Sequence, residues 1–354
     1  MRRGLKFCII FSILLFTAGA YAQGSTRYAG AFLELSIGAR AMAMGDAFVS
    51  VANDGSAFYW NPAGAAGLPR AEVSGMYASL FKGLVRHFQL GFTRPLYGAA
   101  AVSVNWVRLS VPDIPFYDSE WLDPQSAYGT YDQRVAQAGN DPYGFWAQYA
   151  LTAEPQGFSN SNDDAIFITL AKQNKVDLDF GWQYFVIPIT IPLGFNVKLI
   201  RQSLFENKGS AIGFDAGGMI QFGFDDLFND SKLGKFSFGL AAKDLFNTKI
   251  TWNTDSRHAD QIKRSWDLGF SYLQPLPKIS SQLLLAYAFQ KKYETVHNFG
   301  LEYLYYNRLA IRFGLANETF TAGIGIHLSV FQIDYAFRSH DLGATHRINT
   351  AIQF

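Results

Sequence analysis

The chain has 354 residues, and its 30 basic and 29 acidic side chains nearly balance, which argues against a nucleic-acid partner. Charged residues make up only 17% of the sequence, below the roughly 25% of ordinary globular proteins. Aromatic residues reach 16% and glycines number 32. This composition favours a protein with an apolar outer surface over a soluble globular domain.

Residues 1–22 predict a secretory signal peptide. A basic start precedes an apolar stretch from 7 to 18 that is too short to span a bilayer, and Ala20 and Ala22 form a small-x-small cleavage site. The alternative, a short buried helix, would rarely begin behind such a start. We therefore expect cleavage near Ala22, which removes Cys8, the only cysteine, and leaves no thiol chemistry or disulfide.

Residues 23–70 show no regular alternation and predict a separate amino-terminal unit. Phe58, Tyr59 and Trp60 stand side by side in a stretch, 45–68, that is otherwise dense in Gly and Ala. Small residues let backbones pack closely, and the aromatics supply apolar mass. We expect a compact plug, or hatch, inside the lumen of a barrel. A soluble periplasmic subdomain is the alternative.

The same stretch carries signals for a short helix. Asn53 or Asp54 can cap a helix that holds the three aromatics. Pro62 disfavours helical geometry at Asn61 and should end the helix there. Together with Ala63, these residues are expected to shape or gate the plug.

From residue 71 onward, segments of about ten residues alternate strictly between apolar and polar side chains. In 331–337, for example, Phe331, Ile333, Tyr335 and Phe337 share one face. Successive side chains of a strand point to opposite faces, so each segment predicts a strand that is apolar on one side only. A soluble sandwich is the alternative, but the second face is mostly Gly, Ala, Ser and Asn, which suits a lumen better than a solvated surface.

These patterns predict an all-β membrane protein, a 14-stranded antiparallel transmembrane barrel over 71–354. Single-chain bacterial barrels have even strand numbers with both ends periplasmic. One of the three candidates between 164 and 203, where Pro188 and Pro192 interrupt the pattern, should therefore not be a separate strand. The fifteen candidates are 73–81, 87–96, 99–109, 164–171, 177–187, 190–203, 211–223, 235–246, 265–274, 281–291, 296–305, 308–317, 320–328, 330–339 and 345–354.

The carboxyl end alternates up to a terminal aromatic. Ile352 and Phe354 lie on the apolar face of the last strand. This ending is similar to the terminal strand of bacterial outer-membrane proteins, which implies recognition of these two residues by the barrel assembly machinery. With the signal peptide, it indicates the outer membrane of a Gram-negative-type bacterium, with outer-membrane lipid around the wall.

Residues 110–162 predict a long extracellular loop. Its aromatics, among them Trp121, Tyr128, Tyr131 and Trp146, are mixed with Asp, Asn, Pro and Gly, the composition of binding surfaces. We expect a partner-binding loop. The alternative is a lid that folds over the mouth of the barrel.

The residues give no indication of an enzyme. The six histidines are scattered along the chain, and no nucleophile elbow, zinc helix or phosphate loop is present. We assign no catalytic, cofactor-binding or metal-binding residue.

Residues 32–68, FLELSIGARAMAMGDAFVSVANDGSAFYWNPAGAAGL, resemble the signature of the PorV/PorQ family of outer-membrane proteins, relatives of the FadL channels. The Asn-Pro-Ala element of the FadL hatch is matched by Asn61, Pro62 and Ala63. The stretch 236–253 is also similar to this group, although the usual Asn-Leu-Gly reads Asp-Leu-Phe at 244–246. The resemblance is diffuse over the rest of the barrel.

The resemblance implies a barrel closed by a hatch. It implies that the protein binds the signal domains of exported cargo, or a surface protease, in a type IX-like secretion pathway. The alternative that it implies is a FadL-type passive channel for hydrophobic molecules such as long-chain fatty acids. No cofactor is implied.

Overall fold

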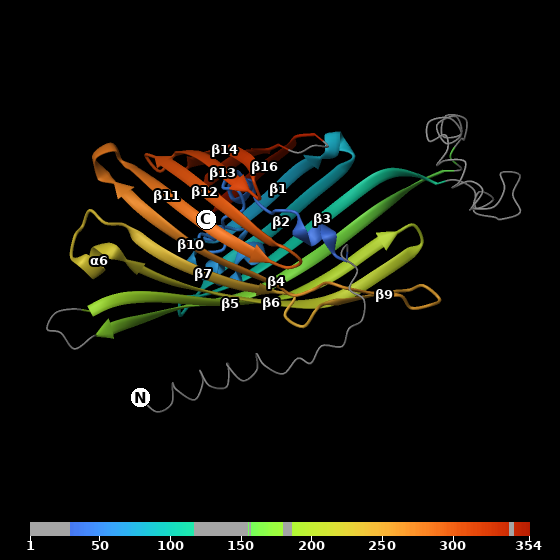
Figure 1. The fold of residues 1–354 in the computed structure, drawn as a ribbon, viewed down its shortest axis with the longest axis horizontal. Coiled ribbons are helices and arrows are strands. Elements are labelled where there is room, and N and C mark those ends of the chain that lie inside the picture. Colours follow the sequence, from blue (N-terminus) through green and yellow to red (C-terminus); the bar gives the residue numbers. More distant parts are fainter. Residues whose placement is uncertain (1–28, 117–154, 156, 180–185, 340–342) are drawn as a thin grey trace, which may run out of the picture.

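A closed antiparallel barrel dominates the computed structural model, which describes residues 29–116, 155, 157–179, 186–339 and 343–354. In this part of the chain sixteen strands form one sheet, and fourteen of them make the barrel wall (Figure 1). β1 (Glu72–Leu80) closes the barrel by pairing with the last strand, β16 (Thr345–Gln353). Closure removes the sheet edges, so the backbone groups of the wall can be satisfied within lipid. The prediction of a 14-stranded barrel is confirmed.

The wall strands follow one another in chain order. Between β1 and β16 they are β2 (Val85–Leu96), β3 (Ala100–Phe116), β4 (Gly157–Asp179), β5 (Val186–Leu204), β6 (Asn207–Gly223), β7 (Lys235–Lys243), β10 (Ser265–Leu276), β11 (Ser281–Lys291), β12 (Thr295–Tyr305), β13 (Leu309–Ala316), β14 (Thr319–Leu328) and β15 (Phe331–Arg338). The short β8 (Lys249–Trp252) and β9 (Ala259–Gln261) form a hairpin outside this ring. It extends the sheet at the start of β6.

The two ends of the barrel differ. The terminal end, as we call it, holds the start of β1 and the last residue, together with α6 (Phe224–Phe228) and η5 (Pro277–Ile279). The loop end holds η3 (Phe81–Gly83) and the β8–β9 hairpin. Figure 1 shows α6 and β9 on opposite sides of the molecule.

Strand length is uneven around the wall. β4 has 23 residues and β5 has 19, whereas β13 and β15 have 8 each. At the loop end, β3 and β4 continue past their neighbours as a two-stranded ribbon, which Figure 1 shows projecting from the barrel.

This ribbon corrects one expectation. Residues 110–116 and 157–162, expected to be loop, are strand, and Ser110 pairs with Asn162. Their side chains are polar on both faces near Ser159 and Asn160, so no alternation marks them. Outside a bilayer a paired strand needs no apolar face.

The ambiguous region between 164 and 203 holds two wall strands. The candidate 164–171 and the start of 177–187 belong to the single strand β4, and β5 contains both prolines. Pairing between β5 and β6 is interrupted between Thr190 and Leu193, where Pro192 has no N–H to donate.

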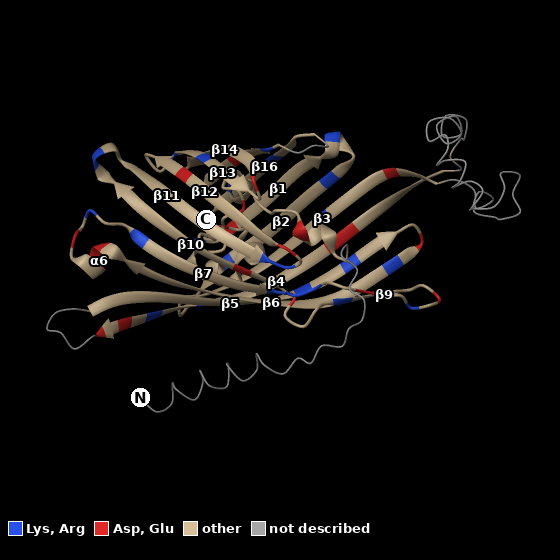
Figure 2. Ribbon diagram, in the orientation of Figure 1, with Lys and Arg blue, Asp and Glu red and all other residues tan. Residues whose placement is uncertain are grey.

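Side chains divide between an apolar outer face and a lumen, as the alternation predicts. On β7, Leu240 is exposed outward and the Phe238 ring lies 5.3 Å from that of Phe270. Ser237 points inward and donates to Ser50 O at 2.9 Å, and Ala241 is buried. Figure 2 shows wall ribbons that are largely free of charged residues, with Lys, Arg, Asp and Glu concentrated toward strand ends and turns.

Candidate functional site

The lumen is filled by residues 29–71, which we call the plug. The plug begins at the loop end, where Glu34 pairs with Lys292 at 2.6 Å. It leaves at the terminal end, where Ala71 O accepts a hydrogen bond from Phe354 N. Its elements are η1 (Ala31–Glu34), α2 (Ala39–Ala43), α3 (Ala57–Trp60) and η2 (Pro62–Gly67). None of the helices in the described part of the chain has the length and hydropathy for a membrane span.

The short helix α3 holds the three aromatics between two turn signals. Its amino-terminal cap residue is Ser56, not Asn53 or Asp54 as the sequence suggests. Asp54 acts one step earlier, because its Oδ1 accepts from Ser56 N at 2.9 Å and from Ser56 Oγ at 2.6 Å. At the other end, Asn61 is extended with φ −157° before Pro62, so the helix stops at Trp60.

Each of the three aromatics has a specific partner inside the barrel. The Phe58 ring lies 4.9 Å from that of Phe167 on the wall strand β4. Tyr59 Oη donates to Leu33 O, and Trp60 Nε1 donates to Ile37 O, both at 2.9 Å. The two polar tips thus tie the middle of the plug to its first turns. The rings fill the space that the small residues leave.

The Asn-Pro-Ala element fastens the plug to the wall. Asn61 is fully buried, and its Nδ2 donates to Val49 O in the plug at 2.9 Å and to Gly218 O in β6 at 3.1 Å. Its Oδ1 accepts from Ala63 N at 3.2 Å, which starts η2. A buried side chain that satisfies backbone groups on both partners fixes their relative position.

Glycines on the lumen face let the plug backbone approach the wall directly. Gly45, with φ 61°, lies against the backbone of Phe299 and Leu315, so a side chain there would be both strained and obstructed. Seven wall glycines sit where a Cβ atom would collide with the plug: Gly194, Gly217, Gly239, Gly269, Gly300, Gly314 and Gly323. The glycines of the plug and of the wall therefore let the two backbones lie in direct contact. We call this line of contact the glycine seam.

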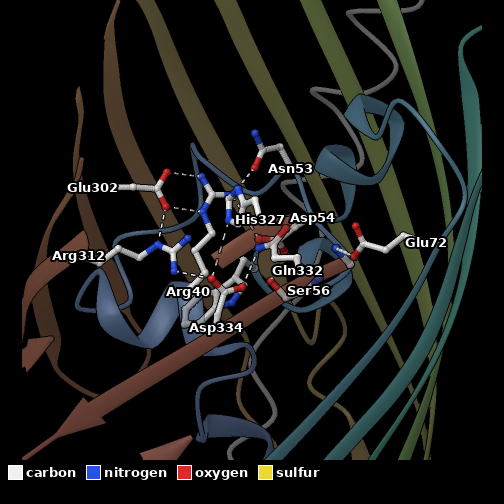
Figure 3. A network of polar contacts seen from close by, with 12 residues as sticks. Arg40, Asn53, Asp54, Ser56, Glu72, Glu302, Arg312, His327, Gln332 and Asp334 are labelled. Carbon is white, nitrogen blue, oxygen red and sulfur yellow. Dashed lines mark hydrogen bonds and ion pairs between the residues drawn. The ribbon is translucent and has the colours of Figure 1, made fainter. Parts of the chain in front are cut away.

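A charged cluster, the latch, joins the plug to the wall near the terminal end (Figure 3). Arg40 of α2 donates to both oxygens of Glu302 on β12, at 2.8 Å each. Arg312 on β13 donates to Glu302 at 2.5 Å and to Asp334 on β15 at 2.6 Å. Arg40 also reaches Asp54 at 3.3 Å. Two cations and three carboxylates thus alternate in one buried network.

Two more contacts extend the latch. Arg40 Nη1 donates to Asn53 Oδ1 at 2.6 Å, and Gln332 donates to Asp334 at 2.7 Å. Next to the latch, Gly55 N donates to Glu72 of β1 at 2.7 Å. The plug is therefore held from both β1 and the β12–β15 side.

Burial and attraction compete at Arg40. Burial by itself would lower the pKa of this guanidinium, but the adjacent Glu302 carboxylate and its hydrogen bonds raise the pKa above its usual range. The group stays charged at every physiological pH. Because Arg40 is buried with its partners, removing one member would leave charges without compensation, which costs about 3 to 5 kcal/mol.

A second cluster lies toward the loop end. Lys198 on β5 pairs with Asp215 of β6 and with Asp244, at 2.8 Å each. Asn196, next to it on the lumen face, donates to Phe58 O at 2.7 Å and so connects this wall region to α3. Lys243 pairs with Asp267 and lies over the Tyr59 and Trp60 rings.

A cavity of about 320 Å³ opens between the plug and the wall at the loop end. We call it the mouth cavity. Its apolar lining includes Leu33, Tyr59, Phe167 and Val296. Its three lysines, at 198, 243 and 292, are each paired with a carboxylate. The cavity lining is therefore part apolar and part polar, and each of its lysines is paired with a carboxylate.

The predicted carboxyl-terminal residues lie on the outer wall at the terminal end. Phe354 is 67% exposed and stacks on Phe92 at 6.3 Å, and Ile352 pairs with Val73 and Phe331. The predicted loop residues Trp121, Tyr128, Tyr131 and Trp146 lie outside the described residues, as does the predicted cleavage site.

The sequence patterns do not reveal the latch as a site, although Asp54 is one of the predicted plug residues. Glu302, Arg312 and Asp334 carry a usable signal, because each is a charged residue on the face of its strand that points away from the apolar side. Arg40 carries none, since no periodicity marks the plug. Among the described residues, no group of three His, Cys, Asp or Glu side chains is placed to hold a metal ion.

The fold and the filled lumen define a class, an outer-membrane type of β-barrel with an internal plug. No family model and no curated protein matches the sequence.

Solved structures similar to the fold include the toluene transporter TbuX of Ralstonia pickettii, with 10% identity, a TM-score of 0.43, and coverage of 90% of this chain and 97% of that one. The TodX monoaromatic hydrocarbon channel, a deltaS2 mutant, has 12% identity, a TM-score of 0.45, and coverage of 90% and 99%. A FadL homologue of Pseudomonas aeruginosa has 10% identity, a TM-score of 0.43, and coverage of 95% and 100%. The PorV/PorQ resemblance stays a prediction.

Proposed function

We propose that this protein is a passive outer-membrane channel for small hydrophobic molecules, which enter at the mouth cavity. The loop end faces the outside, because barrels with even strand numbers place both ends of the chain and the short turns in the periplasm. The observation that carries the proposal is the mouth cavity itself, whose size is in the range of small-molecule sites and whose charges are already paired.

The filled lumen supports this proposal over an open aqueous pore. The glycine seam and the latch hold the described part of the plug in direct contact with the wall, an arrangement that does not favour free diffusion of hydrated solutes. Hydrophobic molecules gain from leaving water for the apolar lining, whereas ions would lose hydration without meeting an unpaired opposite charge.

Filling the cavity tests the proposal. Val296 lines the cavity, so Val296→Trp should occupy its volume and slow the uptake of toluene or oleate into proteoliposomes several-fold. Val330→Trp, in a turn at the terminal end, is the matched control and should leave uptake unchanged. Equal uptake by Val296→Trp and the native protein would refute entry through this cavity.

A second candidate is the PorV/PorQ-type function, the docking of exported proteins or of a surface protease. The observation that favours it is the β3–β4 ribbon, which projects beyond the barrel at the loop end and whose strands are linked in the sequence by residues 117–156. Replacing these residues by a short turn should keep the barrel folded and abolish co-purification of a partner, with solute uptake unaffected. If uptake changes and the intact protein retains no partner, the channel proposal stands alone.

A further inference from the structure

Three arginines gather on the outer wall near the loop end. Arg108 of β3 and Arg201 of β5 flank Asp164 of β4, and Arg86 lies on β2, beyond Arg108. We call these four residues the rim patch. In the sheet register Arg108 is opposite Asp164, and Asp164 is opposite Arg201. Arg86 is opposite Ser110, which is two residues beyond Arg108 on β3 and lies on the same face. The four side chains point outward.

The rim patch carries an excess of positive charge. Asp164 accepts from Arg108 Nε at 2.7 Å and Nη2 at 2.8 Å, so this pair is neutral. Arg86 and Arg201 are exposed and form no hydrogen bond or ion pair with any described residue. Two guanidinium groups are therefore available to a ligand.

An apolar surface begins directly below these charges. The next outward row toward the terminal end consists of Leu90, Trp106, Ile166 and Leu199, which are opposite one another on β2 to β5. Trp106 Nε1 donates to Asp164 at 2.7 Å, and Arg108 lies 5.0 Å over the indole ring. This is the arrangement of a membrane interface, where amphipathic rings separate apolar from polar surface.

We propose that the rim patch binds a phosphate-bearing lipid of the outer leaflet. The guanidinium forks of Arg86 and Arg201 contact the phosphate oxygens, and the acyl chains lie along the apolar row. Guanidinium matches phosphate geometry in a bidentate manner. Only an amphiphile satisfies both surfaces, because a free phosphate would contact the arginines and leave the apolar row unused. This interaction is independent of transport through the lumen.

The opposite rim of the same strands provides a matched control. Arg94 of β2 and Lys172 of β4 are also exposed and point outward, but they lie at the terminal end. Neutralising them removes the same net charge from the barrel without changing the rim patch.

The test uses the full mature protein in detergent, titrated with bis-phosphorylated lipid A and followed by native mass spectrometry. Near a membrane surface each basic residue contributes about one kcal/mol, so Arg86→Gln with Arg201→Gln should weaken binding roughly 30-fold. The control, Arg94→Gln with Lys172→Gln, should change it less than threefold. Lipid A without phosphates should bind both variants and the native protein with equal, low affinity.

Heat-modifiable migration in electrophoresis verifies that each variant is folded. Equal affinity of the native protein and the rim-patch variant for bis-phosphorylated lipid A would overturn the proposal. So would equal losses in the two double variants, since the effect would then be one of net charge alone.

Discussion

The latch predicts that one substitution in the plug loosens it without unfolding the barrel. Arg40→Met removes the two hydrogen bonds to Glu302 and the contact with Asp54. Glu302 keeps Arg312 as a partner, so we take the low end of the cost of breaking a buried pair, about 3 kcal/mol. That free energy raises the open population of the plug roughly 150-fold.

Hydrogen exchange followed by mass spectrometry measures this effect directly. Amides of residues 38–61 should exchange roughly 150-fold faster in Arg40→Met, while those of the wall strands keep their protection. Lys292→Met is the control, since its partner Glu34 is 45% exposed and such a pair contributes at most about 1 kcal/mol, or fivefold. In a double-mutant cycle, the loss of plug stability in the double variant Arg40→Met with Glu302→Gln should be about 1 to 3 kcal/mol smaller than the sum of the losses in the two single variants. Unchanged exchange in 38–61 with Arg40→Met would refute the latch.

Three further substitutions probe the wall, the seam and the aromatics. Phe238→Arg places a charge on the lipid face and should lower the unfolding free energy in lipid by about 2 to 4 kcal/mol, measured by urea titration; an unchanged midpoint would contradict the face assignment. Gly314→Val should push Gly45 away from the wall and raise exchange of the plug amides, whereas a native exchange pattern would argue against the seam. Tyr59→Ala with Trp60→Ala removes the aromatic filling and should raise single-channel conductance with the barrel still resistant to SDS.

The barrel can be predicted well from the sequence because each strand that crosses a bilayer alternates between apolar side chains that face lipid and small or polar side chains that face the lumen. β15 shows this most clearly, with Phe331, Ile333 and Tyr335 outward and Asp334 inward. The prediction of a loop at 110–116 and 157–162, where β3 and β4 form the ribbon, was wrong because alternation is required only within the membrane. Beyond the membrane no lipid selects an apolar face, so Ser159 and its neighbours form a strand without the pattern.

Part of the latch can be predicted from the sequence. The tight turn at 306–308 sets the register of its hairpin, and this register places Glu302 opposite Arg312. Two opposite charges facing one another in a lumen predict an ion pair. Arg40 could not be assigned, because the plug has no repeating geometry from which to deduce which wall strand each residue meets.

The uneven strand lengths have a consequence for the membrane itself. At about 3.3 Å per residue and a tilt near 40°, the 8 residues of β13 or β15 rise only about 20 Å, less than the roughly 25 Å apolar band of such barrels. The 23 residues of β4 more than span the same layer. Lipid must therefore be compressed beside β13 to β15 and at full thickness beside β4, or the barrel must lean. In the first case the surrounding bilayer has a thin sector beside the short strands, which favours placement of the protein in thinner membrane.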